Sequence, residues 1–187
     1  QTGGHLSTAG AMTVGELWQS AGSLAVGELL TVNRGFSQTG AGTITAAYGA
    51  NITNSAGNLT IGNFTSNGPV VITNNDGSVA QVADTVLIAR EGLSVTAQQG
   101  DFLRPIVLSN AGNVISGEVM LTGSSTALRS SGPMSTTLNG SEGGTLQSDG
   151  TLTVAGMLTG STSNLWRYVQ RVAHIPHDDD ITAAMLA

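Results

Sequence analysis

The sequence predicts an all-β protein, with an irregular β-solenoid or β-helix-like repeat body and a short C-terminal helical segment. Three observations lead to this fold class. A frame that begins with glycine recurs along the chain, Val, Ile and Leu recur at alternate positions within it, and the apolar spacing becomes helical after residue 162. Hydrophobic residues make up 40% of the chain, which makes disorder the weaker interpretation.

Residues 1–76 hold the densest copies of this frame, which reads Gly-x-apolar-x-Val/Ile-x-x-apolar. It is plainest at Gly10–Leu17 and, twelve residues later, at Gly22–Leu29; it returns at Gly57–Phe64 and Gly150–Met157. Glycines supply the positive φ that tight turns require, and Asn side chains can bond to nearby backbone at the corners. Because the copies are unevenly spaced, we expect an irregular solenoid or strands braided between several chains.

The middle of the chain is less repetitive. Residues 77–122 contain more apolar strands separated by turn signals such as Gln99-Gly-Asp101, which is typical of a compact antiparallel meander. They are either such a β module or larger coils of the same solenoid. Residues 123–162 are rich in Gly, Ser and Thr and are either an extended connector or shallow coils, with the last copy of the repeat near the end.

The last 25 residues, 163–187, are predicted to be a helical docking segment. An apolar stripe at helical spacing begins after a cap at Ser163 or Asn164 and stops at Pro176. A second short helix is predicted over 181–186. The stripe must pack on this chain, on a sister subunit or on another protein, because it cannot remain exposed. Its proposed docking residues are Leu165, Trp166, Val169 and Val172.

The composition excludes several classes of protein. The net charge is −6, all six basic residues are Arg, and no basic cluster exists, so a nucleic-acid partner is disfavoured. The absence of Cys excludes disulfides and thiolate metal sites. No stretch approaches the roughly 20 apolar residues of a spanning helix, so we expect no membrane insertion. A start at Gln1 is compatible with a lost leader or with a fragment, and secretion is neither indicated nor excluded.

Three patterns were weighed as possible sites. The run His174–Asp180 offers two imidazoles and three carboxylates for a divalent metal, but helix capping and solubility explain the aspartates better. The pairs Asp76 with Asp84 and Glu142 with Asp149 could supply the acid and base of a glycosidase, yet acidic residues are common at turns. Four glycosylation-type motifs fit turn and ladder roles better; they begin at Asn51, Asn58, Asn63 and Asn139. The sequence therefore predicts no enzyme, no catalytic residue, no cofactor and no metal site.

The units Gly-Thr-Leu-Thr-Val and Gly-Asn-Leu-Thr-Ile, together with the stretch Gly143–Val154, resemble repeats in two groups of proteins. One group comprises bacteriophage appendage and decoration proteins of the tail-fibre or head-fibre type. The other comprises filamentous-haemagglutinin-type β-helical adhesins, whose secretion-domain signature is not evident here. The resemblance covers roughly half of the chain and favours the virion group.

The resulting hypothesis is a non-enzymatic structural subunit at a virion surface, as a phage decoration, spike or fibre. The alternative is a fragment of a secreted bacterial adhesin or extracellular filament, and the third is a glycan-cleaving β-helix. We expect a homo-oligomer, a trimer above all, because units of about twelve residues are shorter than the coils of many one-chain solenoids. The other expected partners are a neighbouring structural protein and the host cell surface.

Overall fold

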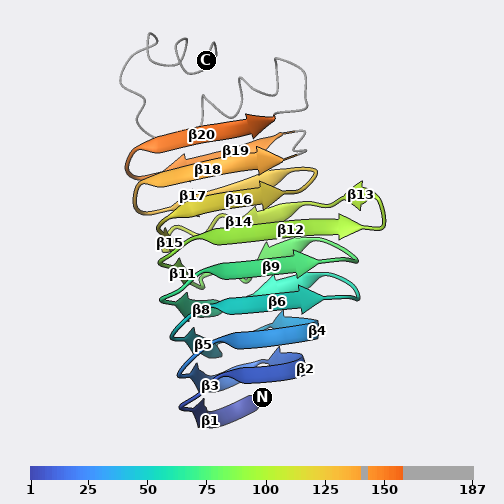
Figure 1. Cartoon of the computed structure of the whole chain (residues 1–187), viewed down its shortest axis with the longest axis vertical. Coiled ribbons are helices and arrows are strands. Elements are labelled where there is room, and N and C mark those ends of the chain that lie inside the picture. Colours follow the sequence, from blue (N-terminus) through green and yellow to red (C-terminus); the bar gives the residue numbers. More distant parts are fainter. Residues whose placement is uncertain (140–142, 158–187) are drawn as a thin grey trace.

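The structure is a computed structural model that describes residues 1–139 and 143–157. Those residues form a β-solenoid of about eight coils and contain no helix (Figure 1). The coils stack along the long axis, with the N-terminus at one end and β20 (Leu152–Met157) near the other. The all-β solenoid prediction is therefore confirmed. The predicted helical segment 163–187 lies outside the described residues.

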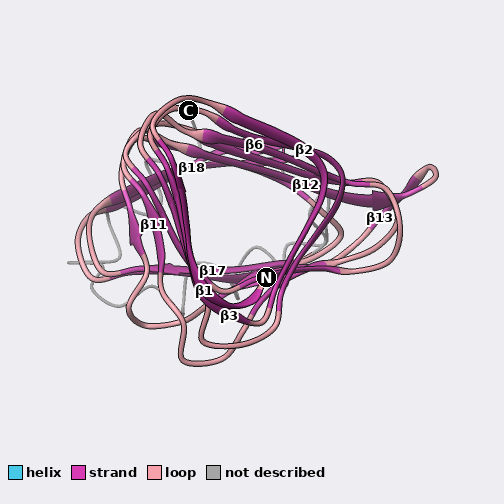
Figure 2. Ribbon diagram, turned by 90° about the horizontal axis from the view of Figure 1, so that it is seen from below, coloured by secondary structure: helices cyan, strands magenta, loops and turns pink. Residues whose placement is uncertain are grey.

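The coils have a triangular outline when viewed along the stack, and each side of the triangle is a parallel sheet (Figure 2). The first face contains β1 (Thr2–Thr8), β3 (Ala21–Val26), β5 (Thr43–Ala46), β8 (Asn63–Ser66), β11 (Leu87–Ala89) and β15 (Val114–Ile115). The second face contains β2 (Met12–Gln19), β4 (Leu30–Gln38), β6 (Ala50–Asn54), β9 (Val70–Asn74), β12 (Leu93–Gln99), β16 (Glu118–Thr122), β18 (Met134–Asn139) and β20. The third face contains β7 (Leu59–Ile61), β10 (Val79–Gln81), β14 (Ile106–Leu108), β17 (Thr126–Ser130) and β19 (Gly144–Ser148).

The second and third faces are continuous because two long strands turn the corner between them. β4 pairs with β6 on the second face through Leu30–Val32 and with β7 on the third face through Ser37. β2 pairs along β4 on both sides of that corner. The first face ends at β15 in the described chain, after which β17 leads directly through residues 131–133 into β18. The solenoid thus changes from three-faced to two-faced coils toward its C-terminal end.

The coil length varies along the stack, and this variation decides between the alternatives for the middle of the chain. Ala50 pairs with Val70, 20 residues further on, whereas Val79 pairs with Ile106, 27 residues further on. β12 pairs in parallel with β9 and with β16, so residues 77–122 form larger coils and not an antiparallel meander. β17 to β20 are likewise paired in parallel, so residues 123–157 form coils and not an extended connector.

The twelve-residue repeat relates neighbouring faces and not neighbouring coils. The Gly10 copy supplies Met12 and Val14 of β2 on the second face, while the Gly22 copy supplies Leu24 and Val26 of β3 on the first face. A complete coil spans about twice the repeat or slightly less, since Met12 pairs with Leu30. The short unit therefore gives no reason to expect that sister chains complete the strands, and the predicted trimer loses that argument.

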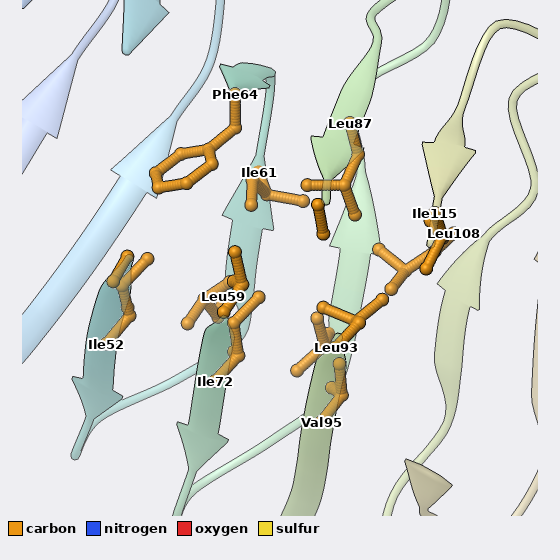
Figure 3. Packing of buried hydrophobic residues seen from close by; sticks show 14 of the residues in the cluster. Ile52, Leu59, Ile61, Phe64, Ile72, Leu87, Leu93, Val95, Leu108 and Ile115 are labelled. Carbon is orange, nitrogen blue, oxygen red and sulfur yellow. The ribbon is translucent and has the colours of Figure 1, made fainter. Parts of the chain in front are cut away.

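Alternate side chains of every face point into one continuous hydrophobic core. On the second face, Leu30, Ala50 and Val70 are stacked in register and are fully buried. Figure 3 shows Ile52, Ile72 and Val95 of that face meeting apolar side chains from the other two faces. Phe36 and Phe64 form an edge-to-face pair with ring centroids 6.5 Å apart, a geometry that stabilises beyond the buried area. Burying each large apolar side chain contributes about 1.5–3 kcal/mol.

Glycine is required where one corner lies directly on the next. Gly49, between β5 and β6, has a φ of 122°, and a Cβ atom there would lie 2.7 Å from the Pro69 carbonyl oxygen of the following coil. Gly68 has the mirror problem, because its Cβ would overlap the Tyr48 carbonyl. These contacts explain the glycine at the start of each repeat: it permits close stacking of the corners.

Polar ladders also run inside the coils. Asn54 and Asn74 are both buried, and the Asn54 Nδ2 donates to the Asn74 Oδ1 at 3.0 Å. A second ladder lies one face away, where the Gln38 Nε2 donates to the Gln19 Oε1 at 2.9 Å. The Asn54 Oδ1 also accepts from the Phe36 backbone N–H, and the Gln38 Oε1 accepts from the Gly62 N–H. These amides satisfy backbone groups that the corners leave unpaired.

Candidate functional site

The most distinctive surface feature is a hairpin that leaves the solenoid at the corner between the second and third faces. β12 continues beyond that corner, turns at Gly100-Asp101 and returns as β13 (Phe102–Leu103), the strand that pairs antiparallel with it (Figures 1 and 2). Gly100 has a φ of 58°, which such a two-residue turn favours. The turn predicted at 99–101 is confirmed, but its projection from the body was not predicted.

The hairpin presents an apolar tip. Phe102 is 74% exposed, the highest exposure among the large hydrophobic side chains of the described residues, and Leu103 beside it is half-buried. Asp101 and Arg104 flank this pair. An exposed aromatic side chain on a hydrogen-bonded hairpin is suited to contact with another macromolecule.

Asp76 fixes the base of the hairpin to the corner of the preceding coil. One carboxylate oxygen accepts from the Gly57 backbone N–H at 3.0 Å, and the other accepts from the Gln99 Nε2 at 2.8 Å. These two hydrogen bonds, in that order, hold the pKa of Asp76 below its ordinary value, with a smaller contribution from the nearby charge of Arg104. Asp76 is therefore ionised at neutral pH and acts as an acceptor for groups of three coils.

Further hydrogen bonds connect the hairpin to this corner. The Gln98 Nε2 donates to the Asn75 Oδ1 at 3.2 Å, and the Gly77 N–H donates to the Gln98 carbonyl at 2.9 Å. The Arg104 N–H donates to the Ala97 carbonyl at 2.8 Å, and its guanidinium donates to the Gln99 Oε1. The position of Phe102 is thus set by the solenoid and not by a free loop.

The acidic residues singled out from the sequence do not converge. Asp76 follows β9 at the corner between the second and third faces, whereas Asp84 lies after β10, at the corner between the third and first faces. Asp149 lies 3.7 Å from the Arg129 guanidinium in an ion pair, and its suggested partner Glu142 lies outside the described residues. The described chain has no group of three or more His, Asp or Glu residues that could hold a metal ion.

The asparagines of the glycosylation-type motifs divide between internal bonds and open surface. The Asn58 Oδ1 accepts from the Ser78 N–H at 3.0 Å, and the Asn63 Oδ1 accepts from the Val86 N–H at 3.0 Å. Asn51 is exposed on the second face. The turn and ladder roles expected of Asn58 and Asn63 are confirmed.

The proposed docking residues and the histidine–aspartate run lie outside the described residues. These are Leu165, Trp166, Val169 and Val172 of the docking stripe, and His174–Asp180. Both remain predictions from the sequence. No helix in the described residues is long and apolar enough to cross a membrane.

Comparison with known proteins adds no relative: no family model matches the chain, and neither does a curated protein or a solved structure.

Proposed function

We propose that this chain is a non-enzymatic structural subunit at a virion surface, as a phage decoration, spike or fibre. The observation that carries the proposal is the unbroken parallel ladder, a sheet of 14 strands that runs the length of the described chain over one core. Every coil is hydrogen-bonded to its neighbours along the long axis. Such a body resists bending and shear, as a fibre or spike requires.

The state of the best-defined carboxylate supports a structural role over glycan cleavage. A glycosidase needs one carboxyl group with a raised pKa to act as the acid. Asp76 has a lowered pKa, and both of its oxygens accept hydrogen bonds that fix the hairpin. Its environment is that of an acceptor in a scaffold.

The second candidate is a segment of a secreted bacterial adhesin or extracellular filament, and the hairpin is the observation that favours it. A rigid rod that presents Phe102 on an anchored hairpin has the form of an adhesive surface, where an aromatic side chain contacts a host receptor. The location would then be extracellular, at the bacterial cell surface. We rank it second because the proposed virion component needs the same rod without a receptor.

Gold-labelled antibodies against the purified chain, applied to virus particles and bacteria from the source, separate these candidates in electron micrographs. We expect label on the particles at regular positions. Label confined to bacterial surfaces would replace the virion proposal with the adhesin. Turnover of host polysaccharide by the purified chain, lost in Asp76→Asn without loss of folding, would overturn both.

A further inference from the structure

Charged side chains are unevenly distributed over the solenoid. Glu16, Arg34 and Arg129 lie on the third face, and others lie at corners, such as Asp84 and Glu91. The second face differs. Of its described outward positions within the strands, from Thr13 to Thr153, one is charged, Glu118 at the first residue of β16.

Two columns of small or uncharged side chains run along the second face. The first column, in register from β4 to β18, is Thr31, Asn51, Val71, Ser94, Met120 and Thr137. The second column, in register from β6 to β18, is Thr53, Thr73, Thr96, Thr122 and Asn139. Val71 is 39% and Met120 is 40% exposed. The face is flat, uncharged and partly apolar, as the centre of a protein interface is.

Net charge restricts which surfaces of this chain can meet a second copy. A chain of net charge −6 repels its own copies, and like charges facing each other across a contact oppose association. The second face avoids this repulsion because it presents almost no charge to an identical face. The third face would bring its Glu and Arg residues into the contact.

The area of the second face is sufficient for a stable pair. Eight strands about 4.8 Å apart, each about five residues wide at roughly 3.3 Å per residue, cover about 550 Å² in projection. Two such faces approach about 1,100 Å², which exceeds the roughly 1,000 Å² expected of a specific interface. The β12–β13 hairpin extends from the edge of this face and adds Phe102 at its rim (Figure 2). The first face, with six strands, is also low in charge but is smaller and ends at β15.

We propose that the second face is the surface through which two copies of this chain pack against each other, face to face, around a two-fold axis. The inference rests on the proposed structural role and deepens it by naming the surface and the partner. Each coil is complete within one chain, so the contact joins finished sheets by their side chains and does not exchange strands.

The test uses the full chain of 187 residues and measures its mass in solution by sedimentation at micromolar concentration. We expect a dimer. The variant Thr73→Glu/Thr122→Glu adds two charges to the second face and should weaken the dimer at least about tenfold, which corresponds to 1.4 kcal/mol. The control Ala25→Glu/Thr65→Glu adds the same charges two strands apart on the first face, at positions equally half-buried, and should leave the dimer unchanged.

A charge-exchange experiment separates repulsion at the face from damage to the fold. Thr73→Arg/Thr122→Arg should also be monomeric, and mixing it with the Glu variant should restore a mixed dimer. Thermal melting of each variant checks that the solenoid remains folded.

A wild-type monomer at these concentrations would overturn the proposal, as would equal loss of association in the first-face control or no restoration in the mixture. A trimer weakened only by the second-face charges would overturn the two-fold pair. Particle labelling and polysaccharide turnover do not depend on self-association, so a labelled monomer would reject this inference and leave the proposed function standing.

Discussion

Replacing Asn74 by Ala removes one rung of the internal asparagine ladder. The Asn74 Nδ2 donates to the carbonyls of Gly57 at 3.1 Å and Ser78 at 2.8 Å. Its Oδ1 accepts from the Asn54 Nδ2 at 3.0 Å and, more weakly, from the Asp76 N–H at 3.4 Å. The side chain is fully buried and ties together three coils. The substitution therefore deletes four hydrogen bonds at one point of the stack.

The expected loss follows from what each partner keeps. The Gly57 carbonyl still accepts from the Asn54 Nδ2 at 3.0 Å, and the Ser78 carbonyl still accepts from the Leu59 N–H at 2.9 Å. No buried carbonyl is left without a donor, so only the net value of the lost bonds counts, about 0.5–1.5 kcal/mol each. We expect a loss of about 2–4 kcal/mol in the free energy of unfolding, a large part of the roughly 5–15 kcal/mol of a typical domain.

Urea unfolding followed by far-ultraviolet circular dichroism measures this loss, and Asn51→Ala is the matched control. Asn51 lies on the neighbouring strand β6 with its side chain exposed, and the same substitution there should change stability by less than about 0.5 kcal/mol. The double variant Asn54→Ala/Asn74→Ala should be less destabilised than the sum of the single variants, because the two amides share a bond. Equal effects at residues 51 and 74 would refute the ladder argument.

Three further predictions concern the corners, the hairpin and the C-terminal segment. Gly49→Ala should destabilise by about 1–3 kcal/mol because of its positive φ and the contact with the Pro69 carbonyl, while Gly132→Ala, with open space around it, should be near neutral in the same urea assay. Asp76→Asn should destabilise at neutral pH, and its difference from wild type should vanish in acid: a lowered folded pKa gives stability that is present above the unfolded pKa of about 3.9 and is lost as the pH falls through the folded value. Melting curves at a series of pH values check this, and a difference that persists in acid would contradict it. Truncation after Thr162 should release the subunit from its particle without lowering the melting temperature, and Trp166→Ala should weaken attachment in the same direction; full occupancy by the truncated chain would contradict docking on a neighbour.

The sequence was sufficient for the fold class because the deciding signals are local. Alternating apolar residues in stretches such as Leu59–Ile61 and Val70–Asn74 predict strands, and the buried and exposed positions follow that alternation. Glycines at corners such as Gly49 and Gly68 mark turns that no side chain would permit. These features depend on a few neighbouring residues, so they are visible without the structure.

The arrangement of coils was not visible because the sequence repeat does not equal the coil. Strands of the first and second faces obey the same rule of alternation and the same glycine start, so the copies at Gly10 and Gly22 look equivalent although they lie on different faces. A period of twelve then implies coils too short for one chain. The third-face segment, which completes the coil, carries a weaker signal; in β2 and β4 it is merely the second half of a strand.

The candidate surfaces depend on this missing register. Thr73, Thr96 and Thr122 form one column only because successive coils there differ by 23 and 26 residues, intervals that no repeat in the sequence predicts. The longer coils are also those that carry the hairpin, so the extra residues that obscure the repeat are the ones that place Phe102 at the rim of the second face. Once the register is known, the outward positions follow by simple alternation and the absence of charge from the second face becomes evident. The property that favours contact between copies is thus distributed over residues 20 or more positions apart, and it arises from the stacking of the coils and not from any motif within one of them.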